Sequence, residues 1–210
     1  MKLYTAGAPN PKRVELYLLE KGLEIPMERV DVRAGQSQTP EFLKKNPLGL
    51  LPVLELDDGT CLAESAAICR YLEELHPDPP LLGEGPVGRA LVGMWNRRME
   101  LTVFVPTASY FGHTLPFFKD RVRQVPAYAE ATRETAREQL VWLDGVLEGS
   151  SYIAGETYSI ADMTALISVD LGIPTVYDIG PELVNLGRWF DEMSARPASK
   201  QLGLGRTRSA

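Results

Sequence analysis

Residues 46–65 read NPLGLLPVLELDDGTCLAES, and this stretch decides the fold. Residues 52–56 predict a strand that Pro52 opens, residues 57–60 a tight turn, and residues 61–62 the returning partner strand. Ser65 follows at once and is expected to cap a helix that runs to about His76. The stretch therefore predicts an antiparallel hairpin that leads directly into a helix.

The sequence before this hairpin alternates strand and helix patterns. We expect a short strand over residues 2–5, a helix over 11–21 with Gly22 as its C-cap, and a strand over 25–32. A short helix should begin at Thr39-Pro40-Glu41 and stop at Asn46-Pro47. Two strands joined by a helix imply a right-handed parallel crossover, so residues 1–76 predict an α/β domain of β-α-β-α-β-β-α, thioredoxin-like order.

The sequence after this domain changes character. Residues 77–88 are rich in proline and glycine and predict a linker. Residues 89–210 predict an all-α domain, in which apolar side chains recur at helical spacing. These are Leu91, Trp95 and Met99 in one helix, and Ala136, Leu140, Leu143 and Leu147 in a helix over about 127–147. Ser159 and Asp162 form a capping-box pattern, and another helix covers about 181–194. Residues 203–210 predict a mobile polar tail.

Composition limits the possible functions. The formal net charge of −6 argues against nonspecific nucleic-acid binding and against a polybasic membrane contact. Two cysteines in 210 residues, and no apolar leader or spanning segment, predict a cytoplasmic protein. His76 and His113 lack metal-ligand spacing, so no metal is expected. Residues 83–88 spell G-x-G-x-x-G, but they follow no strand, so no nucleotide site is expected.

Pro52 and the pair Glu64-Ser65 carry the first chemical signals. A proline at the start of an inner strand removes a ladder donor, and a cis bond there would turn the backbone of Leu51 outward toward a ligand. An ordinary trans proline is the alternative. A helix start with a serine is an anion site, and the neighbouring Glu64 suits an ammonium group. Plain helix capping is the alternative for Ser65.

Taken in order and spacing, the proline-led strand, the hairpin and the Glu-Ser helix start resemble cytosolic glutathione transferases, of a bacterial, nu-like or theta-like branch. The resemblance covers essentially the whole chain, because residues 152–162 also match the helical second domain of that family. It implies that Leu51, Pro52, Glu64 and Ser65 hold glutathione as co-substrate. It also implies a twofold homodimer.

The group that activates the glutathione thiol is left open by the sequence. Family members use a tyrosine, serine or cysteine after the first strand, but Ala8 stands where the serine is expected. The remaining donors are Asn10, Tyr4, Thr5 and backbone amides before the first helix. Asn10 is favoured, because Ala8-Pro9-Asn10 resembles branches in which an asparagine lies near the sulfur.

The hydrophobic substrate site of the family lies between the domains. The resemblance implies that its lining comes from the early helices of the second domain, although core packing is the alternative for Trp95 and Met99. The stretch from Phe104 to Phe118, which we expect Pro106 and Pro116 to break, is the best place for specificity. The candidates are Trp95, Met99, Phe104, Tyr110, Phe111 and His113.

Three functions fit this sequence. The first is an enzyme, a glutathione transferase that conjugates the thiolate to a small hydrophobic electrophile, as in detoxification. The second is a glutathione-dependent disulfide reductase or peroxidase, because the usual serine and cysteine are missing. The third is a non-catalytic glutathione-binding regulatory module.

Overall fold

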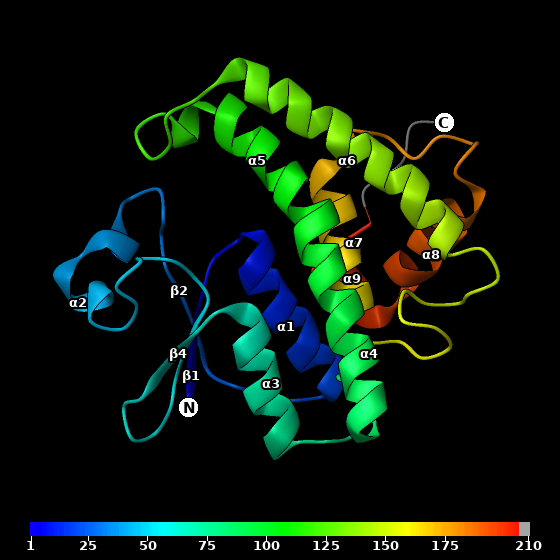
Figure 1. Ribbon diagram of the computed structural model, residues 1–210. Coiled ribbons are helices and arrows are strands. Elements are labelled where there is room, and N and C mark those ends of the chain that lie inside the picture. Colours follow the sequence, from blue (N-terminus) through cyan, green and yellow to red (C-terminus); the bar gives the residue numbers. More distant parts are fainter. Residues whose placement is uncertain (206–210) are drawn as a thin grey trace. The chain divides into compact units, whose positions relative to one another are not determined.

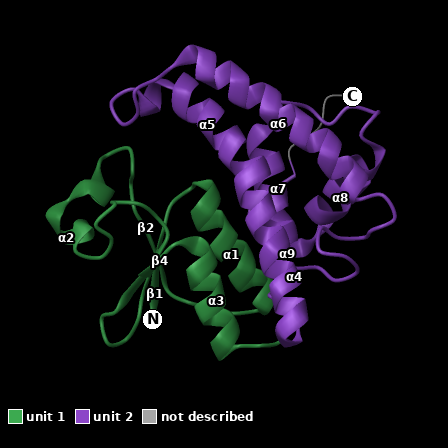
Figure 2. Ribbon diagram, viewed as in Figure 1, with its two compact units in different colours: residues 1–81 green, residues 82–210 purple. Residues whose placement is uncertain are grey.

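The computed structural model describes residues 1–205, which divide into two compact units (Figure 2). The first unit is Met1–Leu81, and the second begins at Leu82. The division therefore falls within residues 77–88, and helix α4 begins at Gly85, before that stretch ends.

The first unit contains a four-stranded mixed sheet in the order β2-β1-β3-β4. Its strands are β1 Lys2–Thr5, β2 Met27–Arg29, β3 Val53–Glu55 and β4 Cys61–Ala63. β1 and β2 are parallel, and β3 is antiparallel to both β1 and β4. The predicted crossover and hairpin are confirmed, although β2 is shorter than the expected 25–32.

Helices cover both faces of this sheet (Figure 1). α1 (Pro9–Lys21) and α3 (Ser65–Leu75) pack side by side on one face, and α2 (Pro40–Leu43) lies on the other, after the 3-10 turn η1 (Gln36–Gln38). Side chains alternate along β1 accordingly. Thr5 meets α1, whereas the Tyr4 ring contacts Phe42 of α2 edge-on, with centroids 6.0 Å apart. Both faces of the sheet are therefore buried at β1.

The helix ends follow the predicted chemistry. Gly22 adopts φ 64° at the end of α1, and its N–H bonds the carbonyls of Leu18 and Leu19. Thr39 accepts a hydrogen bond from the Phe42 N–H at 3.3 Å, so it caps α2 as expected. α1 begins two residues before the expected Pro11, because proline is well tolerated in a first helical turn.

A buried ionic cluster joins the ends of α1 and α3. Lys21, whose side chain is fully buried, pairs with Glu73, and Glu73 also accepts a hydrogen bond from the Tyr17 hydroxyl. Lys21 Nζ donates to the carbonyls of His76, at 2.7 Å, and Pro79. Burial, then Glu73, raises the pKa of Tyr17, so the phenol stays protonated.

The second unit is helical throughout its described part. Its elements are α4 Gly85–Arg98, the π-helical η2 Met99–Phe104, α5 Val105–Thr114, the 3-10 turn η3 Pro116–Phe118, α6 Pro126–Val146, α7 Ile160–Gly172, α8 Val184–Ala195 and α9 Pro197–Gln201. α7 is almost entirely buried, and α4, η2, α5 and α8 pack against it (Figure 1). The apolar face predicted for α6 is confirmed, because Ala136, Leu140, Leu143 and Leu147 are buried.

The expectation that Pro106 breaks the helix was wrong. Residues 85–114 form a continuous helical stretch, with right-handed helical φ and ψ at both junctions of η2. Pro106 lies in the first turn of α5, directly after the π-helical stretch, where Val105 N–H bonds the carbonyl of Glu100. This wider turn shifts the hydrogen-bond register ahead of the proline, so its missing N–H disrupts nothing.

The tail expected from Gly203 to Ala210 is packed where the structure describes it. Leu204 is buried, and the Gly205 N–H donates to Asp170 Oδ1 at 3.0 Å. Residues 206–210 lie outside the described part. The prediction missed this packing because Leu204 is a single apolar residue in an otherwise polar segment.

Candidate functional site

Three backbone segments end together at one edge of the sheet. Tyr4 pairs with Val53, and Val53 pairs with Ala63 across β1, β3 and β4. Because the strands are antiparallel, the next residues along this register are Thr5, Pro52 and Glu64. The chain turns from Thr5 into α1 and from Glu64 into α3, so both helices begin at this edge.

The loop before Pro52 is held by its own side chains. Asn46 Nδ2 donates to the Leu50 carbonyl at 2.9 Å, and Asn46 Oδ1 accepts from the Leu48 N–H at 3.2 Å. Gly49 has φ 61°, and a Cβ there would lie 2.3 Å from Gln38 Nε2, so only glycine fits. Asn46 and Gly49 therefore hold the loop before Pro52 in one conformation.

The loop ends in a cis Leu51-Pro52 peptide bond, whereas the alternative interpretation of Pro52 was an ordinary trans proline. Leu51 is half-buried, and its backbone N–H and C=O make no hydrogen bond within residues 1–205. Two backbone groups therefore remain available next to the start of α3.

The turn into α3 is strained at Glu64. Glu64 has φ 67° and ψ 113°, and among residues 1–205 it is the one residue other than glycine with a positive φ. This conformation costs about 1–3 kcal/mol. Glu64 is the N-cap residue, it is exposed, and it makes no side-chain cap. Strain of this kind is kept where the surrounding structure enforces it, which is common at ligand sites.

Ser65 does not cap α3, so the helix-capping prediction was wrong. Ser65 lies inside the helix as its first residue, and its Oγ accepts a hydrogen bond from Arg13 Nη1 at 3.1 Å. Both residues are buried. The start of α3 thus has no side-chain cap in the described structure, and its first N–H groups point to the sheet edge.

The three candidate thiol activators lie in different surroundings. The Tyr4 hydroxyl donates to Glu55 Oε2 at 2.6 Å, and Glu55 pairs with Lys2 across the sheet, away from the Pro52 edge. The Thr5 hydroxyl donates to buried Glu15. Asn10 lies in the first turn of α1, is half-exposed, and its side chain makes no hydrogen bond within the described residues.

Tyr4 and Glu55 also interact with the charged side chain of Lys45. Lys45 Nζ lies 2.6 Å from Glu55 Oε2 and 4.8 Å from the Tyr4 ring centroid. The hydrogen bond from Lys45, followed by that from Tyr4, lowers the pKa of Glu55. The phenol proton is therefore held by an ionised carboxylate.

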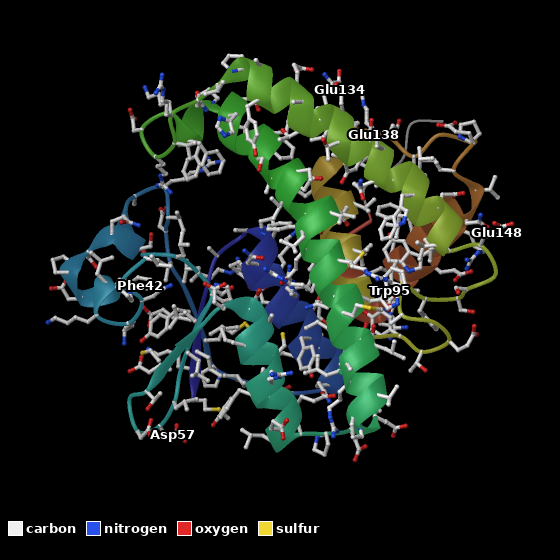
Figure 3. All side chains as sticks on the ribbon, viewed as in Figure 1. Phe42, Asp57, Trp95, Glu134, Glu138 and Glu148 are labelled. Atoms are coloured by element: carbon white, nitrogen blue, oxygen red, sulfur yellow. The ribbon has the colours of Figure 1, made fainter. Side chains whose placement is uncertain are left out.

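The predicted substrate-pocket residues lie along the helical stretch of the second unit. Met99 is fully buried, and Phe104 is half-buried. Trp95, labelled in Figure 3, stacks with Trp142 at 6.1 Å.

Aromatic residues continue along α5. The Tyr110 and Phe111 rings meet edge-on at 5.7 Å. His113 Nδ1 accepts a hydrogen bond from the Val125 N–H at 3.0 Å, and its ring contacts Tyr128. Val125 precedes α6, so His113 also supports the start of that helix.

Two negative expectations can be compared with the described residues. No group of three or more His, Cys, Asp or Glu side chains there has a metal-binding arrangement. No described helix is long and apolar enough to cross a membrane.

The glycines of residues 83–88 serve packing: a Cβ at Gly83, which has φ 88°, would lie 2.6 Å from the Gly88 carbonyl oxygen.

Sequence reasoning missed Arg13 and Glu15. Both lie in α1, where residues 13–18 are all buried, and they contact Ser65 and Thr5 respectively. A signal was nevertheless present, because Lys21 stands on the apolar face with Val14 and Leu18, which indicated that this helix buries charged groups.

Comparison with known proteins agrees with the fold. Residues 8–75 match the glutathione S-transferase N-terminal domain family, and residues 102–197 match the C-terminal domain family. Glutathione S-transferase 2 of Saccharomyces cerevisiae is 33% identical over 98% of this chain and 90% of its own length.

Solved structures are similar over nearly the whole chain. Gtt2 of S. cerevisiae has a TM-score of 0.89 at 33% identity, covering 96% of this chain and 100% of that one. A class Gtt2 glutathione S-transferase of Vibrio parahaemolyticus has a TM-score of 0.85 at 36% identity, with 97% of both chains covered. The fold is that of a glutathione transferase, an α/β thioredoxin-like domain followed by an all-α domain. The chain belongs to the glutathione S-transferase family and is a transferase that uses glutathione.

Proposed function

We propose that this enzyme conjugates the thiolate of glutathione to a small hydrophobic electrophile. The observation that carries the proposal is the uncapped start of α3 beside the open backbone of Leu51, at the edge where α1 also begins. Residues 1–76 would form the glutathione-binding domain, and residues 89–210, after the linker 77–88, the domain for the electrophile.

The cysteinyl backbone and both charged groups of the glutamyl end are proposed to meet a group at this edge. Leu51, beside Pro52, offers N–H and C=O to the cysteinyl backbone. Ser65 and the first N–H groups of α3 bind the glutamyl carboxylate, which the helix dipole also favours. The exposed carboxylate of Glu64 binds the glutamyl ammonium.

Asn10 is the proposed thiolate-stabilising residue. The Tyr4 and Thr5 hydroxyl protons already bond Glu55 and Glu15, whereas the Asn10 amide is uncommitted. The thiol of glutathione has a reference pKa of about 8.5, so a small share is ionised at pH 7. A neutral amide donor contributes about 1–1.5 kcal/mol, and the N-terminal dipole of α1 up to about 1 kcal/mol more. The first turn of α1 contains no acidic residue to oppose this effect.

The electrophile is proposed to contact the aromatic side chains Phe104, Tyr110 and Phe111, with Met99 and His113 supporting them. Apolar, adaptable linings suit hydrophobic electrophiles. Once both substrates are bound, the helical unit contributes mainly proximity, because the thiolate is already a nucleophile. The proposal includes a cytoplasmic, homodimeric detoxification enzyme that requires neither metal nor nucleotide.

A conjugation assay with a chloronitrobenzene and several other electrophiles tests this function. We expect a glutathione-dependent rate that survives dialysis against a chelator. The control is reduction of a mixed disulfide by glutathione under the same conditions. Absence of conjugation with every electrophile, or faster disulfide reduction, would contradict the proposal.

A further inference from the structure

One charged side chain of α6 lies against the aromatic residues of α5. Among the charged residues from Glu130 to Glu138, Arg133 is the one that is half-buried, whereas the others are exposed. Its guanidinium carbon lies 5.7 Å from the ring centroid of Tyr110, within the range of a cation–π contact. A positive charge therefore lies beside an aromatic side chain that is proposed to contact the electrophile.

The guanidinium of Arg133 is anchored from one side. Its Nε donates to the carbonyl of Val176, in the chain between α7 and α8, at 3.3 Å. Its Nη1 lies 3.6 Å from Glu130 Oε2, which is beyond hydrogen-bond distance, and the Glu130 side chain is 63% exposed. An ion pair as exposed as this one contributes little. The contact with Val176 therefore fixes the direction of the guanidinium.

Most donors of this guanidinium are not used by the protein. A guanidinium has five N–H groups, and within residues 1–205 the Nε group of Arg133 is the one that donates to a protein oxygen. Its Nη groups form a planar fork, which binds a carboxylate through two parallel hydrogen bonds. The side chain is 31% exposed, so this fork is open to a ligand.

We propose that Arg133 is a specificity-determining residue of the electrophile site and that it selects electrophiles that carry a carboxylate. The aromatic part of such an electrophile contacts Tyr110 and Phe111, and its carboxylate accepts hydrogen bonds from the Nη groups of Arg133. This inference rests on the proposed function, in which these aromatic side chains line the electrophile site. A half-buried cation loses water when a neutral ligand covers it, so it favours an anionic ligand.

Two chloronitrobenzenes that differ in one group test the inference. They are 4-chloro-3-nitrobenzoate, which is anionic, and 4-chloro-3-nitrobenzamide, which is neutral and of nearly the same size. In both, the glutathione thiolate attacks the ring carbon that bears chlorine, a C–S bond forms, the C–Cl bond breaks and chloride leaves. The amide withdraws more electron density than the carboxylate. The measured quantity is therefore the ratio of the kcat/KM values for benzoate and benzamide, compared between protein variants.

Three variants probe the charge of Arg133 and its surroundings. Arg133→Met should lower the ratio about tenfold, mainly through the KM for the benzoate, because the carboxylate loses a charged partner. Arg137→Met is the matched control, since it removes the same charge from an exposed position of the same helix, and it should change the ratio less than about twofold. Glu130→Gln removes the nearby carboxylate and should raise the ratio about twofold.

A purely structural role of Arg133, as a tie between α6 and the Val176 carbonyl, makes a different prediction. Loss of such a tie would affect both probes alike, so an unchanged ratio in Arg133→Met overturns the inference. If Arg133→Met does not fold, Arg133→Lys replaces it. Lysine keeps the charge and loses the planar fork, so the ratio should fall about threefold. An unchanged ratio in both Arg133→Lys and Glu130→Gln also overturns the inference.

Failure of the proposed function has a separate signature. Calorimetry with the two products, S-(4-carboxy-2-nitrophenyl)glutathione and its carbamoyl counterpart, measures the preference without turnover. If wild type converts neither probe but loses its preference for the carboxylate product in Arg133→Met, the proposed function is wrong and the carboxylate site stands. If both probes are converted and the ratio does not depend on Arg133, the function stands and the inference alone is wrong.

Discussion

The starts of α3 and α7 share a serine, yet they are built in opposite ways. At α7, Ser159 and Asp162 complete a capping box, and Asp162 also accepts hydrogen bonds from Ile153 N–H at 2.8 Å and Trp189 Nε1 at 3.0 Å. At α3, Ser65 caps nothing and Glu64 is strained. The start of α7 is saturated by side-chain hydrogen bonds, whereas the start of α3 has no side-chain cap and is the proposed glutathione site.

The difference teaches that the residue type at a helix start does not define its use. A saturated start contributes free energy of folding and offers nothing to bind. An unsaturated start gives up that contribution and keeps N–H groups and a dipole for an anion. The predictions below perturb each start in turn.

Asp162→Ala should have the largest effect. It leaves the buried N–H groups of Ile153, Ser159 and Trp189 without their acceptor, which should lower the free energy of unfolding by about 3–5 kcal/mol. Urea unfolding measures this. A loss below about 1 kcal/mol would show that the closed start is not a major source of stability.

The pH dependence of stability should also report on Asp162. Burial, opposed by four hydrogen bonds, raises its pKa to about 6. Because this lies above the unfolded value of about 3.9, the contribution of this group is greatest below pH 4 and falls by about 3 kcal/mol as the pH rises through 6.

Asp162→Asn, which does not titrate, isolates this group. The free energy of unfolding of wild type minus that of the variant should decrease from pH 4 to pH 7. A difference that stays constant or increases with pH would contradict the raised pKa.

Glu64→Gly tests the strain at the open start. Glycine adopts positive φ freely, so the variant should gain about 1 kcal/mol of stability while glutathione binding weakens. Thermal unfolding and calorimetry measure the two effects. Glu64→Gln is the control, because it keeps the positive φ and removes only the charge. If Glu64→Gly binds glutathione as tightly as wild type does, Glu64 is not part of the glutathione site.

Asn10→Ala tests the proposed thiolate-stabilising residue. Loss of one amide donor should raise the pKa of the thiol of bound glutathione by about 1 unit. The ultraviolet absorbance of the thiolate measures this titration. Tyr4→Phe is the control and should leave this titration unchanged, since the phenol bonds Glu55. An unaltered titration in Asn10→Ala would favour the backbone amides of α1 instead.

Local patterns in the sequence predicted the elements well. Gly22, Thr39 and the pair Ser159 and Asp162 act within a single turn of chain, so their roles follow from residue type and spacing. The hairpin after Pro52 is equally local. These features were sufficient for the fold order and for the family resemblance.

Contacts between distant segments were not predictable in this way. Arg13 meets Ser65 across 52 positions of sequence, and this contact replaces the cap that a serine at a helix start normally makes. The prediction for Pro106 was wrong because the π-helical turn before it, which packs against α7, has no local sequence signal. Both errors arise where tertiary contacts override a local rule.

The most direct test compares glutathione binding to Ser65→Ala and Ser159→Ala by calorimetry. We expect Ser65→Ala to weaken binding by about 1–3 kcal/mol, because a charged carboxylate loses a donor. Ser159→Ala should lower stability by about 1 kcal/mol and leave the dissociation constant unchanged. An unchanged dissociation constant in Ser65→Ala would contradict the claim that the open start of α3 is the glutathione site.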